Sequence, residues 1–250
     1  MKYTVITGAS SGIGYETALA FAARGKNLII VARRLDKLEE LKSKVKEINS
    51  DLDVVVVTSD LSVTDQAYNL YKDLKRYQIE TWINNAGLGE GAFVADQKLE
   101  KVENMLRVNI ESLTILSTLY VRDYADVEGA QLINVSSALG YAIAVGSVTY
   151  SASKYYVSAF TEGLAKELEL KGAKLKAKIL APAITESEFA QKSIDAEAFD
   201  FKANMPKYHT SKQMAGFMVE LYDSNEVVGI VDQNYTFNLR GQIYPVISEF

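Results

Sequence analysis

Short apolar runs alternate along this chain with longer segments of helical periodicity. The strand-like runs are Tyr3–Thr7, Asn27–Ala32, Asp53–Thr58, Thr81–Asn84, Gln131–Ser136 and Leu175–Ala181. Several are unbroken stretches of Val, Ile and Leu, which is typical of parallel strands buried on both faces. Between them, segments such as Leu35–Ile48 and Thr64–Tyr77 have the spacing of helices. This order predicts an α/β fold, a doubly wound parallel sheet of about seven strands with helices on both faces.

No feature of the chain divides it into separate domains. It has no Pro/Gly-rich linker, internal repeat or low-complexity tract, and all three prolines fall after residue 180. The sequence therefore predicts a single domain over residues 1–250. Residues 186–210 are polar and mixed, and we expect them to form a loop or helical insert beside a substrate pocket. The pattern assigns no element to the aromatic and β-branched stretch Val227–Phe250.

Composition excludes several chemistries. The chain has no cysteine and a single histidine, His209, which excludes a thiol nucleophile, a disulfide, a thiolate metal site and a site of several histidines. We therefore expect no metal, and proton chemistry mainly on Tyr, Lys, Asp, Glu or Ser. A net charge of −5 gives no electrostatic reason to expect nucleic acid or an anionic membrane as partner. No apolar run approaches the ~20 residues of a bilayer span, and no signal peptide fits the N-terminus, so we expect a cytoplasmic protein.

A glycine-rich turn follows the first strand-like run and opens a helix. It reads Thr7-Gly8-Ala9-Ser10-Ser11-Gly12-Ile13-Gly14, with the spacing G-x-x-x-G-x-G. Gly8 permits a tight turn, Gly12 lets the backbone approach a pyrophosphate, and Gly14 lets the helix pack close to the sheet. Phosphate would lie at the helix N-terminus, where unpaired N–H groups point outward. The turn predicts a dinucleotide site, and the alternative is a strand–helix turn that binds nothing.

The same turn also matches G-x-S-x-G, the nucleophile elbow of α/β-hydrolases. In that alternative Ser10 would be the nucleophile and His209 its base. The elbow belongs on a central strand that follows others, whereas this turn follows the first strand of the chain. A hydrolase would also leave the buried polar residues described below without a role.

Two arginines follow the second strand-like run. A site that prefers NAD places an acidic residue near this point for the ribose hydroxyls, but this chain has Ala32, Arg33 and Arg34. An arginine can bind the 2′-phosphate of NADP through two parallel hydrogen bonds. The pair therefore favours NADP(H) over NAD(H), and the alternative is that both arginines are solvated surface charges.

Polar residues interrupt two helical stripes that should be buried. Spacings of three and four join Val102, Leu106, Asn109, Leu113, Leu116 and Tyr120, and likewise Tyr150, Lys154, Val157, Phe160, Leu164 and Leu168. Lysine is almost never fully buried without a partner, and Lys154 is a near neighbour of Tyr150 on the helix face. The alternative is a satisfied core Asn109 and a Lys154 that extends to solvent. Two interruptions in one domain, beside a phosphate turn, indicate a site.

Small and polar residues also end two later strands. Ser136 and Ser137 end the fifth strand-like run, and Asn84-Asn85-Ala86-Gly87 ends the fourth. Ligands in open α/β sheets bind at the carboxyl ends of the strands. We therefore expect a substrate near the serines and a cofactor ring close to the small residues.

Taken together, these motifs resemble the short-chain dehydrogenase/reductase family over residues 3–190. The resemblance rests on Thr7-Gly8-x3-Gly12-Ile13-Gly14, Asn84-Asn85-Ala86-Gly87, Asn109, Ser137 and Tyr150-Ser151-Ala152-Ser153-Lys154. Each motif is degenerate alone, but their order and spacing are specific, and the distance to Tyr150 selects Ser137 over Ser136. The resemblance implies a Rossmann-type NAD(P)-binding domain with an active site of Asn109, Ser137, Tyr150 and Lys154.

The resemblance also implies a role for each residue. Tyr150 would be the general acid in carbonyl reduction and the base in alcohol oxidation, with its pKa lowered by Lys154 and the nicotinamide ring. Lys154 would bind the nicotinamide ribose, Ser137 the substrate oxygen, and Asn109 a water of a proton relay. The implied cofactor-binding residues are Gly8, Ser10, Ser11, Gly12, Ile13, Gly14, Arg33, Arg34, Asp60, Leu61, Asn85, Ala86, Gly87, Tyr150, Lys154, Pro182, Thr185 and Ser187.

Two departures from the family pattern follow the sixth strand-like run. Ala183 stands where the family usually has a glycine, and Ser187 where it has a threonine, but both are small. The resemblance implies an NADP-dependent oxidoreductase that interconverts a small-molecule carbonyl and a secondary alcohol, as a homodimer or homotetramer. The alternative is a non-catalytic NADP-binding regulator, which the retained Tyr150 and Lys154 disfavour.

Overall fold

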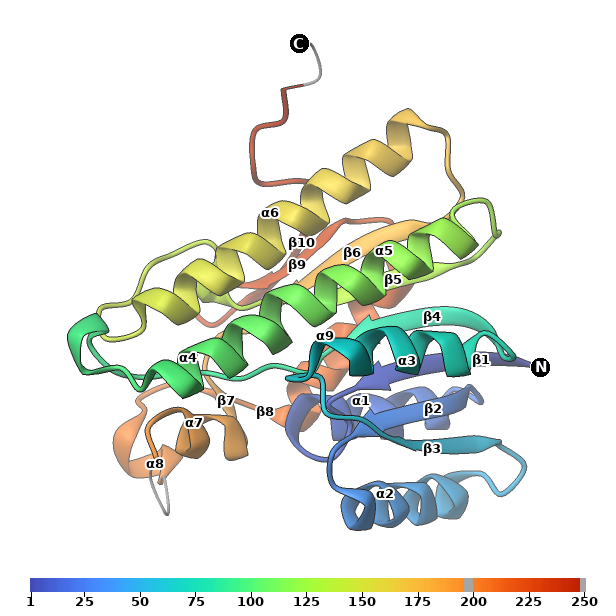
Figure 1. Cartoon of the computed structure of the whole chain (residues 1–250), viewed down its shortest axis with the longest axis horizontal. Coiled ribbons are helices and arrows are strands. Elements are labelled where there is room, and N and C mark those ends of the chain that lie inside the picture. Colours follow the sequence, from blue (N-terminus) through green and yellow to red (C-terminus); the bar gives the residue numbers. More distant parts are fainter. Residues whose placement is uncertain (196–199, 248–250) are drawn as a thin grey trace.

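An eight-stranded sheet crosses the molecule in the order β10-β9-β6-β5-β4-β1-β2-β3 (Figure 1). The computed structural model describes residues 1–195 and 200–247. The strands are β1 Lys2–Thr7, β2 Asn27–Ala32, β3 Val54–Thr58, β4 Gln78–Asn84, β5 Gln131–Val135, β6 Lys176–Ala181, β9 Val228–Val231 and β10 Phe237–Arg240. Neighbouring strands are parallel except for β9 and β10. The predicted α/β fold is confirmed, and all six strand-like runs are strands of this sheet.

Helices cover both faces of the sheet. One face carries α1 Gly12–Ala23, α2 Leu35–Ile48 and α9 Ser211–Asp223, and the other carries α3 Thr64–Leu74, α4 Leu99–Leu106, α5 Leu113–Tyr124 and α6 Val148–Leu170. Alternate residues of β1 and β2 point to opposite faces. Ile6 and Ile30 join the core under α1, α2 and α9, whereas Val5 and Ile29 join the core under α3, α5 and α6. Burial on both faces explains why these strands are unbroken apolar runs.

The strand order reverses at β1. Strands β2 and β3 extend the sheet on one side of β1, and β4 lies on its other side, followed by β5 and β6. In open α/β sheets, ligands bind in the crevice at such a switch point, outside the carboxyl ends of the strands. The glycine turn after β1 and the residues that follow β4 and β5 lie at this edge.

The structure differs from the predicted elements in two places. The unassigned stretch 227–250 contains β9 and the antiparallel β10, which adds an eighth strand to the expected seven. The stripe around Asn109 is not one α-helix, because a π-helical segment, η2 Arg107–Ser112, joins α4 to α5. Such wider turns occur often at functional sites, and Asn109 lies inside this one.

Residues 186–210 contain several short elements. They are β7 Thr185–Glu186, α7 Glu188–Ser193, α8 Phe201–Asn204 and β8 His209–Thr210, and β7 pairs with β8. Residues 196–199 of the expected insert lie outside the described residues. Within the described ranges, no helix has the length and apolar character that crossing a bilayer requires.

Candidate active site

The glycine turn packs directly against the residues that follow β4. Gly8 and Gly12 have φ values of +68° and +59°, the left-handed region that favours glycine. A Cβ on Gly8 would lie 2.8 Å from Cα of Ala86. The Thr7 hydroxyl accepts hydrogen bonds from the backbone N–H groups of Asn85 and Ala86, each at 3.0 Å. The turn and the end of β4 therefore form one unit.

Gly14 is required for a more local reason than close packing of the helix on the sheet. A Cβ on Gly14 would collide with the carbonyl oxygen of Gly8 and with the side-chain amide of Asn85. That amide donates to the Thr7 carbonyl at 2.9 Å, across the start of α1. Gly14 thus leaves room for the Asn85 side chain, while the neighbouring Ile13 packs against the core.

Two serines lie over the glycine turn. A Cβ on Gly12 would lie 3.2 Å from Cβ of Ser187 and 3.8 Å from Oγ of Ser211. Thr185 lies two residues before Ser187, in β7, and Pro182 follows β6 directly. The segment after β6 therefore faces the turn across the space where the sequence predicts a pyrophosphate.

Only one of the two arginines reaches the glycine turn. The Arg34 guanidinium donates to the Ser10 hydroxyl at 3.2 Å and forms an ion pair with Glu188 of α7 at 3.1 Å. Arg33 is exposed. Ser11 is the N-cap residue of α1 and, within the described part of the chain, makes no side-chain capping bond. Both arginines remain at the edge where the 2′-phosphate is expected.

Asp60 and Leu61 follow β3, the strand next to β2. Burial acts to raise the pKa of Asp60, but hydrogen bonds from the backbone and hydroxyl of Ser62, at 3.0 and 2.7 Å, and the Arg33 charge hold that pKa below its usual value. Leu61 is buried, and its carbonyl accepts from the Ser112 hydroxyl of η2. Asp60 is therefore a fixed anion close to Arg33.

Asn109 joins the segment after β4 to α6, and it is 1 % exposed. Its Oδ1 accepts from the Leu88 N–H at 2.9 Å, and its Nδ2 donates to the Leu88 carbonyl at 2.9 Å and to Ser153 Oγ at 3.1 Å. Both amide protons are used, and among the hydrogen bonds of the described residues Oδ1 accepts one, so one of its lone pairs can accept another. These bonds hold the chain near Gly87, where an added Cβ would lie 3.5 Å from Lys154 Nζ.

Ser137 follows β5 and begins the 3-10 turn η3 Ala138–Gly140. Its Oγ accepts from the Leu139 N–H at 3.1 Å and donates to the Pro182 carbonyl at 3.4 Å. A hydrogen bond between Ser137 and the Tyr150 side chain acts to lower the pKa of Tyr150. Ser137 therefore faces Tyr150 across the site.

Tyr150 and Lys154 lie one turn apart near the start of α6. Lys154 is 4 % exposed, and its Nζ donates to the Val135 carbonyl at 3.0 Å and lies 5.8 Å from the centroid of the Tyr150 ring. Burial raises the pKa of Tyr150 to about 12 and lowers the pKa of Lys154 to about 8, because both charged forms lose water. The expectation that Lys154 lowers the Tyr150 pKa is not met in this structure, where Ser137 is the lowering group. Ser136 is bonded to the backbone of α6, since its Oγ donates to the Lys154 carbonyl at 2.9 Å.

Phe189 is a site residue that the sequence reasoning missed. Its ring lies 5.6 Å from the Tyr150 ring, centroid to centroid. A Cβ on Gly89 would lie 2.7 Å from the Phe189 ring. The only signal for Phe189 was its place in the polar insert, because the contact joins segments that are remote in the chain.

Among the hydrogen bonds of the described residues, none joins His209 to Ser10. The imidazole lies against the rings of Phe217 and Tyr235, at centroid distances of 5.3 and 5.8 Å. Burial lowers the pKa of His209, against a hydrogen bond with the Tyr235 backbone. Ser10 instead accepts from Arg34. Among the hydrogen bonds and ion pairs of the described residues, none joins His209 to a carboxylate, so the hydrolase alternative lacks its triad.

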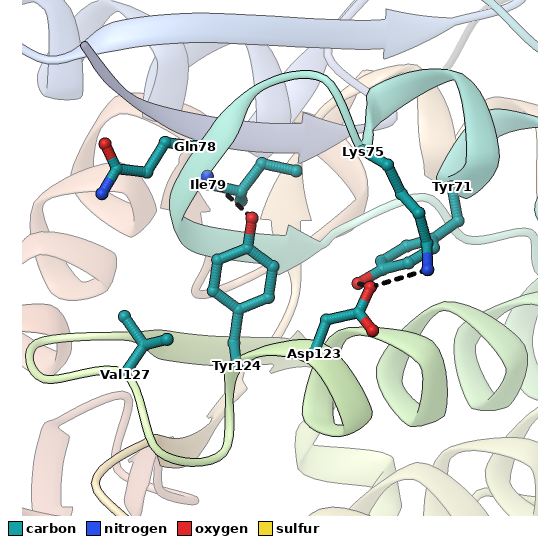
Figure 2. A pocket seen from close by; sticks show the side chains of 7 residues that line it. All are labelled: Tyr71, Lys75, Gln78, Ile79, Asp123, Tyr124 and Val127. Atoms are coloured by element: carbon teal, nitrogen blue, oxygen red, sulfur yellow. Dashed lines mark hydrogen bonds and ion pairs between the residues drawn. The ribbon is translucent and has the colours of Figure 1, made fainter.

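A surface hollow of about 360 Å³ lies away from these residues, at the amino end of β4 (Figure 2). Several of its polar groups bond to one another. Asp123 accepts from the Tyr71 hydroxyl at 2.9 Å and pairs with Lys75 at 3.0 Å, and the Ile79 N–H donates to the Tyr124 hydroxyl at 3.1 Å. This hollow is not the candidate active site, because it lies at the opposite end of β4 from the glycine turn and from Tyr150 and Lys154.

Comparison with known proteins agrees with this geometry. The family model of short chain dehydrogenases matches residues 2–198. An uncharacterised oxidoreductase of Staphylococcus saprophyticus is 33% identical over 196 residues, which cover 78% of this chain and 79% of that protein. A short-chain dehydrogenase from Sphingobium yanoikuyae, solved in complex with NADPH, has a TM-score of 0.83 at 27% identity, over 92% of this chain and 87% of that one. A bulky-bulky ketone specific alcohol dehydrogenase from Comamonas testosteroni has a TM-score of 0.79 at 26% identity, over 92% and 86%. The chain therefore belongs to the short-chain dehydrogenase family and is an oxidoreductase.

Proposed function

We propose that this protein is an NADP-dependent oxidoreductase that interconverts a carbonyl and a secondary alcohol, with Tyr150 as the general acid and base. One observation carries the proposal. Tyr150, the buried Lys154 and Ser137 converge at the carboxyl edge of the sheet, beside the glycine turn that opens α1. The Sphingobium relative binds NADPH, and the Comamonas relative acts on ketones, which supports the same assignment here.

The residues around the turn fit a nicotinamide dinucleotide. Side chains at Gly8 and Gly12 would meet Ala86 and Ser187, so glycine lets the turn approach both segments closely and leaves its backbone uncovered by a side chain, as a bound pyrophosphate requires. The Lys154 ammonium has three donors, of which the Val135 carbonyl takes one, and the others are suited to ribose hydroxyls. We propose as cofactor-binding residues Gly8, Ser10, Ser11, Gly12, Ile13, Gly14, Arg33, Arg34, Asp60, Leu61, Asn85, Ala86, Gly87, Tyr150, Lys154, Pro182, Thr185 and Ser187.

The side chains of this chain handle the proton. The cofactor supplies or accepts the hydride when bound. Because burial raises the pKa of Tyr150 to about 12, the phenol holds its proton near neutral pH and can donate it to a carbonyl oxygen. The Ser137 hydroxyl, which faces Tyr150, orients the same carbonyl oxygen through a hydrogen bond. Asn109 keeps Leu88 and Ser153 in place, and its open Oδ1 lone pair suits the water of a proton relay beside Lys154.

Further features of the proposal concern the assembly and the pocket. The family resemblance implies a homodimer or homotetramer. Of the expected insert 186–210, we assign the described helix α7 to the wall of the substrate pocket, because Phe189 of α7 lies against Tyr150. The test of the proposed function is nicotinamide fluorescence on titration with NADPH and NADH, followed by NADPH oxidation with a panel of ketones and aldehydes. Binding without turnover would favour a regulator, and no binding of either cofactor would refute the proposal.

The arginine pair predicts the cofactor preference. Replacing both Arg33 and Arg34 by Ala should weaken NADPH binding about 10- to 100-fold, because hydrogen bonds to a charged phosphate are lost, and change the NADH Kd by less than about twofold. The matched control removes two cations from α2, in Lys37→Ala with Lys44→Ala, whose partners are Glu40 and Glu47. Fluorescence titration measures both Kd values. An equal loss for NADPH and NADH would contradict the assignment of the 2′-phosphate to these arginines.

A further inference from the structure

The C-terminal segment 241–247, here named the strap, is attached to helix α6 through Glu162. The Glu162 side chain is 1 % exposed, and its Oε2 accepts from the backbone N–H groups of Ile243 and Tyr244, the latter at 2.9 Å. The Glu162 carbonyl also accepts from the Gln242 side chain at 2.8 Å. A buried carboxylate is costly unless it is hydrogen-bonded. Among the ion pairs of the described residues none involves Glu162, so its oxygens are satisfied by N–H and O–H donors.

The strap also contacts the turn η3 through two tyrosines. The Tyr244 hydroxyl donates to the Gly140 carbonyl, and the Tyr141 hydroxyl donates to Oε1 of Glu162. The two rings stack with centroids 5.3 Å apart. Burial raises the pKa of Tyr244 to about 12, and burial together with Glu162 raises the pKa of Tyr141, so both hydroxyls keep their protons near neutral pH. Residues at the end of the chain thus bond to the turn that begins at Ser137.

Hydrogen bonds within the turn η3 hold the Ser137 hydroxyl. The Leu139 N–H donates to Ser137 Oγ at 3.1 Å, and the Gly140 N–H donates to the Ser137 carbonyl at 2.8 Å. The turn packs closely against α6, because a Cβ on Gly140 would lie 2.7 Å from the Lys154 carbonyl. On the β6 side the Ala138 N–H donates to the Pro182 carbonyl at 2.7 Å. The strap is a third support, and it holds the Gly140 carbonyl.

We propose that Tyr244 is a positioning residue for the reaction: through the Gly140 carbonyl it fixes the turn η3, and thereby the direction of the Ser137 hydroxyl. This inference rests on the proposed function. Tyr244 does not touch the reacting atoms; it acts through Ser137. The strap thereby gives a role to the C-terminal stretch that the family resemblance did not cover.

The test is a double-mutant cycle between Tyr244 and Ser137. Tyr244→Phe removes one hydroxyl and keeps the stacked ring and both backbone bonds to Glu162. We expect kcat/KM for the carbonyl substrate to fall about tenfold, because small displacements of a positioning group are costly, with the NADPH Kd unchanged. In a Ser137→Ala background the same change should cause no further fall. The matched control is Tyr68→Phe, since Tyr68 is exposed on α3.

Two outcomes of the kinetic and thermal measurements would overturn the proposal. One is an equal loss of kcat/KM from Tyr244→Phe with and without Ser137, and the other is a lower Tm with kinetics unchanged. Hydrogen exchange at the Leu139 and Gly140 amides gives a readout that does not depend on activity, and we expect faster exchange in Tyr244→Phe. If the wild-type protein shows no NADPH turnover, the proposed function is wrong. If hydrogen exchange at these two amides is the same in Tyr244→Phe as in the wild type, Tyr244 does not fix the turn η3 and the positioning role is wrong.

Discussion

Replacing Tyr150 by Phe should lower kcat for carbonyl reduction by about 10²- to 10⁴-fold, the usual contribution of a positioned general acid. Phenylalanine keeps the ring beside Phe189 and Lys154, so only the hydroxyl is lost, together with its hydrogen bond to Ser137. For the same reason the NADPH Kd should change by less than about twofold. Steady-state rates of NADPH oxidation and a fluorescence titration measure the two quantities.

A neighbouring tyrosine provides the control for this result. Tyr156 lies on the same helix, and its hydroxyl bonds to Thr114 at 2.8 Å rather than to the site. Tyr156→Phe should therefore keep wild-type kcat. Substantial activity in Tyr150→Phe, or a comparable loss in Tyr156→Phe, would contradict the role of Tyr150.

Replacing Lys154 by Met should abolish most activity and yet stabilise the fold. Activity should fall about 100-fold or more, because a preorganised cation at the site is lost. Burial lowers the pKa of Lys154 from 10.5 to about 8, so at pH 7 the folded state carries a desolvated ammonium. Relief of that penalty, less the lost hydrogen bond to Val135, should raise the free energy of unfolding by about 2 kcal/mol.

The effect of the Lys154→Met change should depend on pH. Between pH 8 and 10.5 the unfolded chain binds more protons at Lys154 than the folded one, so wild-type stability from this group rises with pH. The advantage of Lys154→Met is therefore full below pH 8 and vanishes above 10.5. Denaturant unfolding at several pH values measures it. A variant less stable than wild type at pH 7 would contradict the predicted cost of burying this ammonium.

Lys178 is the matched control, because it is also buried and burial also lowers its pKa to about 8. Its Nζ donates to the carbonyls of Leu221, Tyr222 and Ser224, at 3.0, 2.9 and 2.7 Å, and so closes the end of α9. Lys178→Met leaves three carbonyls without this donor and should lower the Tm while kcat stays unchanged. The two lysines thus separate a structural cation from a functional one.

The central strands and the long helices were predictable from the sequence. Strands buried on both faces are unbroken apolar runs, and helices that cover a sheet have apolar residues at helical spacing. Runs such as Asn27–Ala32 and Leu35–Ile48 coincide with β2 and α2. The antiparallel β10 was not predictable, since Phe237–Arg240 is short and its side chains are only partly buried. The π-helical segment Arg107–Ser112 was also missed, because a buried stripe at spacings of three and four continues through the wider turn.

Contacts within the candidate site were predictable only between residues that are close in the sequence. Tyr150 and Lys154 lie one turn apart on a single helix, so their spacing alone placed them together. The partners that adjust the site come from remote segments. Tyr244 bonds to Gly140, and Glu188 pairs with Arg34, through contacts that no local pattern contains. The pKa of Tyr150 likewise depends on burial, which the sequence does not quantify.

Hydride transfer to a carbonyl can be tested by following the transferred hydrogen. The wild-type protein is supplied with NADPH that carries deuterium at both C4 positions and with a ketone or aldehyde that it reduces, and mass spectrometry then locates the label in the product. We expect one deuterium on the carbinol carbon of the alcohol, formed by the wild type and nearly absent with Tyr150→Phe. An alcohol without deuterium at that carbon, or labelled product formed equally by both proteins, would contradict this expectation.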